Sequence, residues 1–205
     1  MIKKLPNKCS EQLPSVDAIL MASGFSRRFG AYDKLLQKFQ GKPLALFTLE
    51  LVCGMPEFEN VIFVTASPKV ARLASGTRAY TIRNTAPERG MRESIRLGVA
   101  SSSAEFYCFF PCDQPFIEAS AVRRLLAAAK PGGIVEPVAG GERRSPSVFS
   151  GAFRDELLSL REGERGASIK DRHRNAVVSL AFDEAIIFSD IDTPEELSIL
   201  SEFSI

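Results

Sequence analysis

The chain has 205 residues, of which 45% are hydrophobic, and this length and composition suit one globular domain with a buried core. Its 26 basic and 25 acidic residues leave a net charge of +1, whereas a nucleic-acid-binding protein usually concentrates enough Lys and Arg to neutralise roughly 6 to 10 phosphates. We therefore expect no nucleic-acid partner, and any bound anion is expected to be small.

The first 15 residues are basic but lack the apolar core of a signal peptide, and no later run reaches the roughly 18 apolar residues that cross a bilayer. We expect a cytoplasmic protein without membrane contact, folded as a single domain over residues 1–205 with 1–15 as a flexible extension. The four cysteines have neither disulfide nor zinc-site spacing, so we expect reduced thiols, with Cys108 and Cys112 buried as small hydrophobic residues.

Short apolar runs alternate along the chain with segments that have helical periodicity. The expected elements in chain order are strand 16–21, helix 42–53, strand 61–66, helix 67–75, strand 79–83, helix 91–101, strand 105–110, helix 120–130, strands 133–138 and 146–150, helix 151–161, strand 176–182 and helix 193–203. Ser67 and Thr193 are suited to cap two of these helices. Nearly continuous apolar strands separated by helices indicate a mostly parallel sheet covered on both faces, which is a three-layer α/β/α, Rossmann-like fold.

The loop after the first expected strand, SGFSRRFGAYDK, brings glycines and cations together. Ligands of parallel α/β sheets bind beyond the carboxyl ends of the strands. Glycine lets the backbone approach a ligand closely, and cations surround phosphate oxygens, so we expect the loop amides at Gly24, with Arg27, Arg28 and Lys34, to bind a polyphosphate. The loop has neither the Walker A spacing nor the G-x-G-x-x-G dinucleotide fingerprint. A solvated basic turn is the alternative interpretation.

Acidic residues follow two later apolar runs. Asp113 comes soon after the expected strand 105–110, and Asp190 and Asp192 stand just before the last expected helix. Mg²⁺ in nucleotide enzymes is typically held by one or two carboxylates together with the phosphates of the substrate. Carboxylates from two strand ends therefore predict a magnesium site beside the cationic loop. The alternatives are an ordinary turn at Asp113 and stabilisation of a helix N-terminus by the later pair.

Four segments, in order, resemble motifs of the MobA-like nucleotidyltransferase family, and within it the molybdenum cofactor cytidylyltransferases. The family loop L-A-A-G-x-S-x-R-x-G followed by Lys is matched by LMASGFSRRFGAYDK. The later motifs N…G-M-x-x-S, C-D-Q-P-F and D-I-D-T-P-E-[DE]-L are matched by Asn84 with residues 90–94, by 112–116 and by 190–197. The resemblance covers most of the chain.

This resemblance implies a fold of the nucleotide-diphospho-sugar transferase type. It also implies transfer of a nucleoside monophosphate from a nucleoside triphosphate to a phosphate on an acceptor, with release of pyrophosphate. The implied substrates are CTP and molybdopterin or its molybdenum form, and the product would pass through transient contact with a molybdoenzyme or its maturation factor. The acceptor supplies the nucleophile, so an activated Ser, Cys or His is not required.

The resemblance also assigns residues to the site. The residues implied at the nucleotide are Ala22, Ser23, Gly24, Arg28, Lys34, Gly90, Ser94 and Asp113. Among them Arg28 and Lys34 would hold the triphosphate, and Gly90 and Ser94 would face the base or ribose. Asp113 and Asp192 would hold Mg²⁺. The implied catalytic set is Arg28, Lys34 and Asp113.

The chain departs from the family pattern in several places. Ser23 replaces the second alanine of L-A-A-G, and Ala22 stands where relatives that use GTP usually have glycine, which favours CTP. On the acceptor side, Arg144 replaces the glycine of G-x-P, and residues 163–168 match G-D-x-G-A-R imperfectly, without its final arginine. The arginines that we consider as substitutes for that charge are Arg143, Arg144 and Arg165.

Two alternative functions remain open. In the first, the same loop and metal pair transfer a nucleotide to a sugar 1-phosphate or another small phosphate. In the second, the protein is a non-catalytic accessory that binds a nucleotide or cofactor. The presence of Lys34, Asp113 and Asp192 favours an enzyme, provided that the three side chains meet at one edge of the sheet.

Overall fold

The computed structural model describes residues 14–24, 29 and 33–202. Arg27, Arg28 and most of the expected N-terminal extension lie outside the described residues. Eight strands of the described chain form one sheet in the order β10-β7-β9-β6-β1-β4-β5, with β8 paired to β7. The strand bounds are β1 Val16–Ala22, β4 Val61–Thr65, β5 Tyr80–Arg83, β6 Phe106–Pro111, β7 Ile134–Ala139, β8 Glu142–Arg143, β9 Ser147–Ser150 and β10 Val177–Phe182.

The predicted mostly parallel sheet is confirmed, and each of the seven expected strands is present within two residues of its predicted bounds. Strands β5, β4, β1 and β6 run parallel to one another, as do β7 and β10. Strand β9 runs antiparallel to both β6 and β7 and therefore joins the two parallel groups. The apolar runs predict strands, but they do not predict this reversal.

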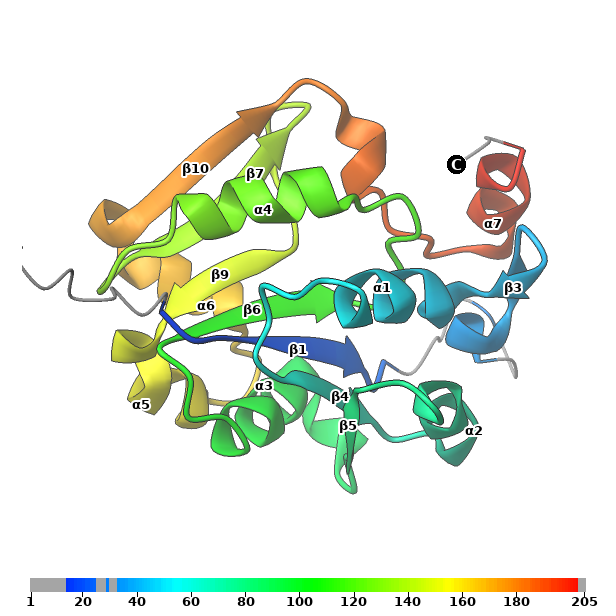
Figure 1. The fold of residues 1–205 in the computed structure, drawn as a ribbon, viewed down its shortest axis with the longest axis horizontal. Helices are drawn as coiled ribbons and strands as arrows, with labels where there is room; N and C mark the ends of the chain where they lie inside the picture. Colours follow the sequence, from blue (N-terminus) through cyan, green and yellow to red (C-terminus); the bar gives the residue numbers. More distant parts are fainter. Residues whose placement is uncertain (1–13, 25–28, 30–32, 203–205) are drawn as a thin grey trace, which may run out of the picture.

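Helices cover both faces of the sheet, as the three-layer prediction requires. The α-helices are α1 Leu44–Cys53, α2 Pro68–Ala71, α3 Met91–Ala100, α4 Ala119–Ala127, α5 Arg154–Leu158, α6 Gly166–Arg172 and α7 Pro194–Leu200. Figure 1 shows α1 and α4 in front of the sheet and α6 behind it. The expected helices 67–75 and 151–161 are each split into a short α-helix and a 3₁₀ turn, Arg72–Ala74 and Gly151–Phe153.

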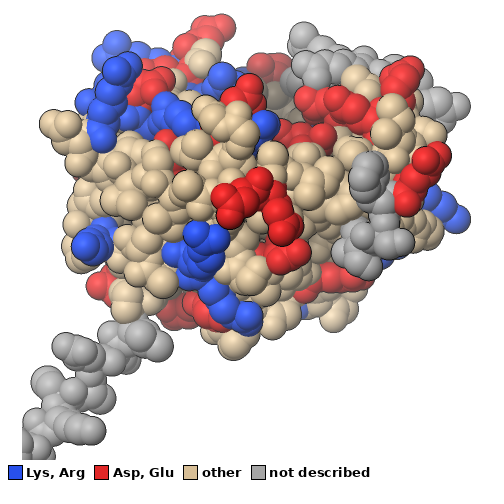
Figure 2. All heavy atoms as spheres, turned by 90° about the horizontal axis from the view of Figure 1, so that it is seen from above, with Lys and Arg blue, Asp and Glu red and all other residues tan. Residues whose placement is uncertain are grey.

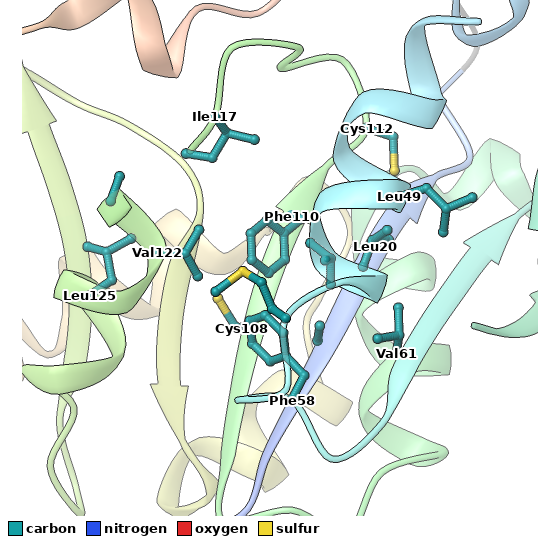
Figure 3. Packing of buried hydrophobic residues seen from close by; sticks show 14 of the residues in the cluster. Leu20, Leu49, Phe58, Val61, Cys108, Phe110, Cys112, Ile117, Val122 and Leu125 are labelled. Atoms are coloured by element: carbon teal, nitrogen blue, oxygen red, sulfur yellow. The ribbon is translucent and has the colours of Figure 1, made fainter. Parts of the chain in front are cut away.

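The core lies in two layers because successive residues of a strand point to opposite faces of the sheet. Leu20, Cys108 and Phe110 pack with the residues of α1 and α4, and Figure 3 shows this layer. Ile19 and Phe109 point the other way and pack with α3, α5 and α6. Cys108 and Cys112 are free and buried, as predicted, and burial raises the pKa of both thiols well above the usual range.

Helix α7 is held against a small hairpin that the sequence did not predict. The hairpin strands are β2 Lys38–Phe39 and β3 Lys42–Pro43, joined by a turn in which Gln40 and Gly41 both have positive φ. Leu197 and Leu200 of α7 pack with Phe39 and Leu44 in a third apolar cluster, and α7 lies beside β3 in Figure 1. This packing fixes the position of the acidic segment that precedes α7.

Two surface properties bear on partners. Within the part of the chain that the structure describes, we find no helix of the length and apolar character needed to span a membrane. The face seen in Figure 2 carries both acidic and basic side chains, with uncharged surface between them. This mixture agrees with the net charge of +1.

Candidate functional site

The carboxyl ends of β1 and β6 open into a cavity of about 460 Å³. Ser23 and Gly24 follow β1 at its wall, and Asp113 follows β6. Other predicted residues that line the cavity are Lys34, Gly90, Ser94 and Asp192. Ala22 is buried with the residues of the first core layer instead and is not among the lining residues. A cavity of this size is in the range that holds nucleotide-sized ligands, which is about 300 to 1,000 Å³.

Lys34 connects the two acidic segments. Its Nζ atom lies 2.7 Å from Oδ2 of Asp113 and 2.7 Å from Oδ1 of Asp192. Asp33 starts the 3₁₀ turn Lys34–Leu36 by accepting a hydrogen bond from the backbone amide of Leu35 at 3.2 Å. Segments that are far apart in the sequence therefore meet at one point, as the sequence analysis required.

Backbone contacts hold the two carboxylates beside each other. The amide of Ile191 donates to the carbonyl of Asp113 at 3.0 Å, and the side chain of Gln114 donates to the carbonyl of Phe188 at 3.0 Å. At Asp192 the backbone amide donates to Oε2 of Glu196 at 2.7 Å. Glu196 is part of a capping box with Thr193 at the start of α7, so the helix start also orients Asp192.

Charge and burial shift the pKa values at this point. Burial lowers the pKa of Lys34, but the charges and hydrogen bonds of Asp113 and Asp192 outweigh it, so the pKa is raised and the ammonium stays charged. Asp190 has an exposed surface, but desolvation by the protein atoms around its carboxyl group and the negative charge of Asp113 raise its pKa to about 6. The site thus combines one firmly charged cation with an acidic cluster.

The donor atoms suit a hard divalent cation that also binds substrate phosphates. Oδ1 of Asp113 is buried and has no hydrogen-bond partner among residues 14–24, 29 and 33–202. Such an orphaned carboxylate oxygen is a ready ligand for Mg²⁺ or Mn²⁺. The described part of the chain has no group of three or more His, Cys, Asp or Glu side chains arranged for a metal. Two carboxylates alone leave most coordination positions to substrate oxygens and water.

The opposite wall of the cavity is the start of α3. Gly90 precedes this helix with φ +73° and ψ −160°, a conformation that favours glycine. Ser94, one turn later, is 2% exposed, and its Oγ accepts a hydrogen bond from Nδ2 of Asn84 at 3.4 Å. Asn84 is itself fixed, because its Oδ1 accepts from the amide of Ala86 at 2.9 Å. Since the oxygen of Ser94 accepts from Asn84, its hydroxyl hydrogen is left to donate elsewhere.

The structure distinguishes the three arginines considered for the acceptor. Arg143 forms ion pairs with Glu136 at 2.7 Å and with Asp171 at 2.6 Å, so two carboxylates compensate its charge. Arg144 pairs with exposed Glu142 at 2.8 Å, and its Nε atom is buried with no hydrogen-bond partner among the described residues. Arg165 is exposed just before α6.

Arg144 belongs to the connection between β8 and β9. Ser147, the first residue of β9, pairs with Phe109 near the end of β6. The connection therefore lies toward the same edge of the sheet as Asp113, which follows β6. Arg144 is the one of the three arginines that has a buried side-chain nitrogen without a hydrogen-bond partner among the described residues.

Glu136 is a buried charged residue that the sequence analysis passed over. It is 1% exposed in β7, and Oε2 lies 2.6 Å from Nζ of Lys170, while Oε1 lies 2.7 Å from Arg143. Lys170 also donates to Oγ of Ser147 at 3.2 Å. These contacts tie α6 to β7 and β9.

Comparison with known proteins matches residues 18–177 to the family model described as the MobA-like NTP transferase domain. The chain belongs to this family. It is 30% identical over 190 residues to a molybdenum cofactor guanylyltransferase of Shewanella sp. (strain MR-4), an alignment that covers 88% of this chain and 92% of the relative.

Solved structures support the fold of this MobA-like NTP transferase. A nucleotidyl transferase from Methanothermobacter superposes with a TM-score of 0.80 at 16% identity, over 92% of this chain and 96% of that one. Rv0371c of Mycobacterium tuberculosis H37Rv, in a complex with manganese, superposes with a TM-score of 0.73 at 22% identity, over 94% of this chain and 100% of that one. The expected α/β fold of the nucleotide-diphospho-sugar transferase type is thus confirmed.

Some lining residues of the MobA-like NTP transferase were not predicted. They are Met21, Leu35, Pro87, Met91, Pro111 and Cys112. Met91 lies inside the G-M-x-x-S motif and is half exposed, which is unusual for a large apolar residue. That motif was the available signal. Cys112 begins the C-D-Q-P-F motif and Met21 lies inside the first motif, so these motifs were signals too. Leu35, Pro87 and Pro111 line the cavity because of how the chain turns between elements, which residue type alone does not reveal.

Proposed function

We propose that this MobA-like NTP transferase transfers CMP from CTP to the phosphate of molybdopterin, or of its molybdenum form, and releases pyrophosphate. The observation that carries the proposal is the contact of Lys34 with both Asp113 and Asp192 at the wall of the 460 Å³ cavity. A nucleotidyl transfer needs a cation for the triphosphate and oxygen ligands for a metal at one place. This cluster would provide both.

The two substrates are supported by different observations. The relative described as a molybdenum cofactor guanylyltransferase supports a molybdenum cofactor as the acceptor. Its name specifies guanylyl transfer, whereas Ala22, at the position that is usually glycine in relatives that use GTP, supports CTP. A direct comparison of CTP with GTP therefore measures the base preference.

The residues of the chain act by positioning and by charge. Lys34, which stays protonated, would bind phosphate oxygens, together with Arg28 and the loop at Gly24. The hydroxyl of Ser94 would donate to the base or ribose from the wall at Gly90. A divalent cation held by Asp113 and Asp192 would neutralise charge at the α-phosphate. The acceptor phosphate would then attack the α-phosphorus in line, the bond to the leaving pyrophosphate would break, and no protein nucleophile would be required.

A direct assay tests the proposal. Pure protein is incubated with Mg²⁺, one of the four labelled nucleoside triphosphates and either molybdopterin or a panel of sugar 1-phosphates, and pyrophosphate is measured. We expect pyrophosphate with CTP and molybdopterin. Preference for GTP would overturn the base assignment, and turnover with a sugar 1-phosphate alone would overturn the acceptor. Nucleotide binding without pyrophosphate release under any combination would identify an accessory protein.

A cellular role follows from the same proposal. The product would be made in the cytoplasm and passed to a molybdoenzyme or its maturation factor by transient contact. A pull-down with product-loaded protein, compared with apo protein, measures whether the contact depends on the finished cofactor.

A further inference from the structure

The ammonium of Lys34 occupies the space between the two carboxylates assigned to the metal. It lies 2.7 Å from one oxygen of each carboxylate, and the side chains of Lys34 and Asp113 are only 13% and 18% exposed. Partial burial strengthens the attraction of the lysine to Asp113, whereas the side chain of Asp192 is 43% exposed, so its attraction is more strongly screened by solvent. In this structure, therefore, the acidic pair already has a cation.

A divalent ion that used the same two carboxylates would lie close to the ammonium. Like charges at this separation repel strongly in a partly buried site. A free divalent ion thus has to displace the ammonium, which would lose two short, charge-assisted hydrogen bonds. A metal that arrives bound to a triphosphate is different, because its phosphate oxygens can accept the displaced ammonium.

We propose that Lys34 closes the Asp113 and Asp192 pair to free divalent cations, so that the metal enters only together with the nucleoside triphosphate. The inference rests on the proposed function, since it takes the metal ligands and the triphosphate contact from there. It adds the order of binding: the metal–nucleotide complex enters as a unit and the lysine changes partners from carboxylate to phosphate.

Two features of the site permit this exchange. Oδ1 of Asp113 is buried and without a hydrogen-bond partner among the described residues, so one ligand atom for the metal is present that the lysine does not use. The lysine side chain has four rotatable bonds, which let its ammonium move by several ångströms without backbone movement. The exchange thus needs no rearrangement of β6 or of the segment before α7.

The test measures metal binding without nucleotide and without turnover. Mn²⁺ is titrated into the full chain, and free Mn²⁺ is followed by electron paramagnetic resonance. The variants are Lys34→Met, which removes the charge; Lys34→Arg, which keeps it; and Lys42→Met, a matched control whose lysine pairs with Glu50. We expect Lys34→Met to bind Mn²⁺ on the order of tenfold more tightly than the wild type, with the other two variants unchanged.

Further variants locate the bound ion and guard against misfolding. Adding Asp113→Asn to Lys34→Met should abolish the gain in Mn²⁺ affinity. Circular dichroism verifies that each variant is folded. If Lys34→Met does not fold, Lys34→Gln replaces it. Tight Mn²⁺ binding by the wild type, or no gain in the folded neutral variant, would overturn the inference. Because no acceptor is used, pyrophosphate release with CTP in the separate assay still tests the proposed function on its own.

Discussion

The backbone amide of Ile191 donates a hydrogen bond to the backbone carbonyl of Asp113 at 3.0 Å. Together with the hydrogen bond from the Gln114 side chain to the carbonyl of Phe188, this contact attaches the segment before α7 to the chain that leaves β6. Because Asp192 follows Ile191 directly, the contact brings its carboxylate to the carboxylate of Asp113. The acidic pair is therefore set by the backbone, and replacing either carboxylate should leave the surrounding fold in place.

Asp113→Asn should lower turnover by about 100-fold or more, the usual effect of removing one preorganised charged group from an active site. The Asn side chain has the same shape as Asp but lacks the negative charge that contacts Lys34 and would hold a metal. Pyrophosphate release measured at saturating CTP checks the expectation. Asp183→Asn, at an exposed position, is the control and should be fully active. Equal turnover of the two variants would remove Asp113 from the site.

Gly90→Ala should weaken nucleotide binding by about tenfold, because an L-residue at φ +73° is strained and relaxation would shift the start of α3. Gly76→Ala is a matched control, since Gly76 has φ +81° and, like Gly90, has no atom within 4 Å of an added Cβ. Both variants should lose about 1 kcal/mol of unfolding free energy or more. Calorimetric titration with CTP should distinguish them, and an equal loss of affinity would contradict a role for Gly90 at the nucleotide.

Arg144→Gln should raise the KM for the acceptor by about tenfold, because a guanidinium binds phosphate through two parallel hydrogen bonds and an amide does not. The Kd for the nucleotide should be unchanged. Arg165→Gln changes the exposed arginine just before α6 and serves as the control. If Arg165→Gln raised the KM for the acceptor and Arg144→Gln did not, the assignment of the acceptor contact would be reversed.

Glu136→Gln should lower the free energy of unfolding by about 3 kcal/mol, because Lys170 would remain buried without its carboxylate. Urea unfolding measures the loss, with exposed Glu184→Gln as the control.

Burial raises the pKa of Glu136, but Lys170 and Arg143 outweigh it and hold the pKa below its ordinary value of 4.5. The stabilisation is therefore complete above pH 4.5 and is lost as the pH falls through the lower folded value. The difference between Glu136→Gln and the wild type should narrow in acid, and a difference independent of pH would contradict the ion pair.

The sheet was predictable because its central strands are continuous apolar runs. Residues 61–65 are all buried, and such a run has few alternatives to a covered strand. The sequence did not predict helix α6, because its only buried residues are Ile169 and Lys170. A single buried apolar residue cannot show the repeat of apolar positions that indicates a helix. The hairpin of β2 and β3 was missed because each strand has two residues.

The candidate site could be predicted as a set of residues but not as a set of contacts. Apolar runs that stop just before Asp113 and just before Asp190 pointed to the two acidic segments. The first run is strand β6, but the second is a 3₁₀ turn, Ala185–Phe188, so the expected strand end before Asp192 is wrong. The sequence did not predict that Lys34 contacts both Asp113 and Asp192. Those contacts depend on the three-dimensional position of Lys34 relative to the sheet, and the local sequence pattern does not determine that position. Arg143 was taken as a ligand-binding candidate because its partner Glu136 sits unnoticed within an apolar strand.

The separation of 158 residues between Lys34 and Asp192 has a consequence for synthesis of the protein. At ribosomal rates of about 5 to 20 residues per second, the second aspartate is added on the order of ten seconds after the lysine. Until then a nascent chain has the ammonium and at most one of its two carboxylate partners. All strands of the sheet are therefore synthesised before Lys34 can contact both carboxylates, and a chain that stalls before Asp192 lacks one of the two.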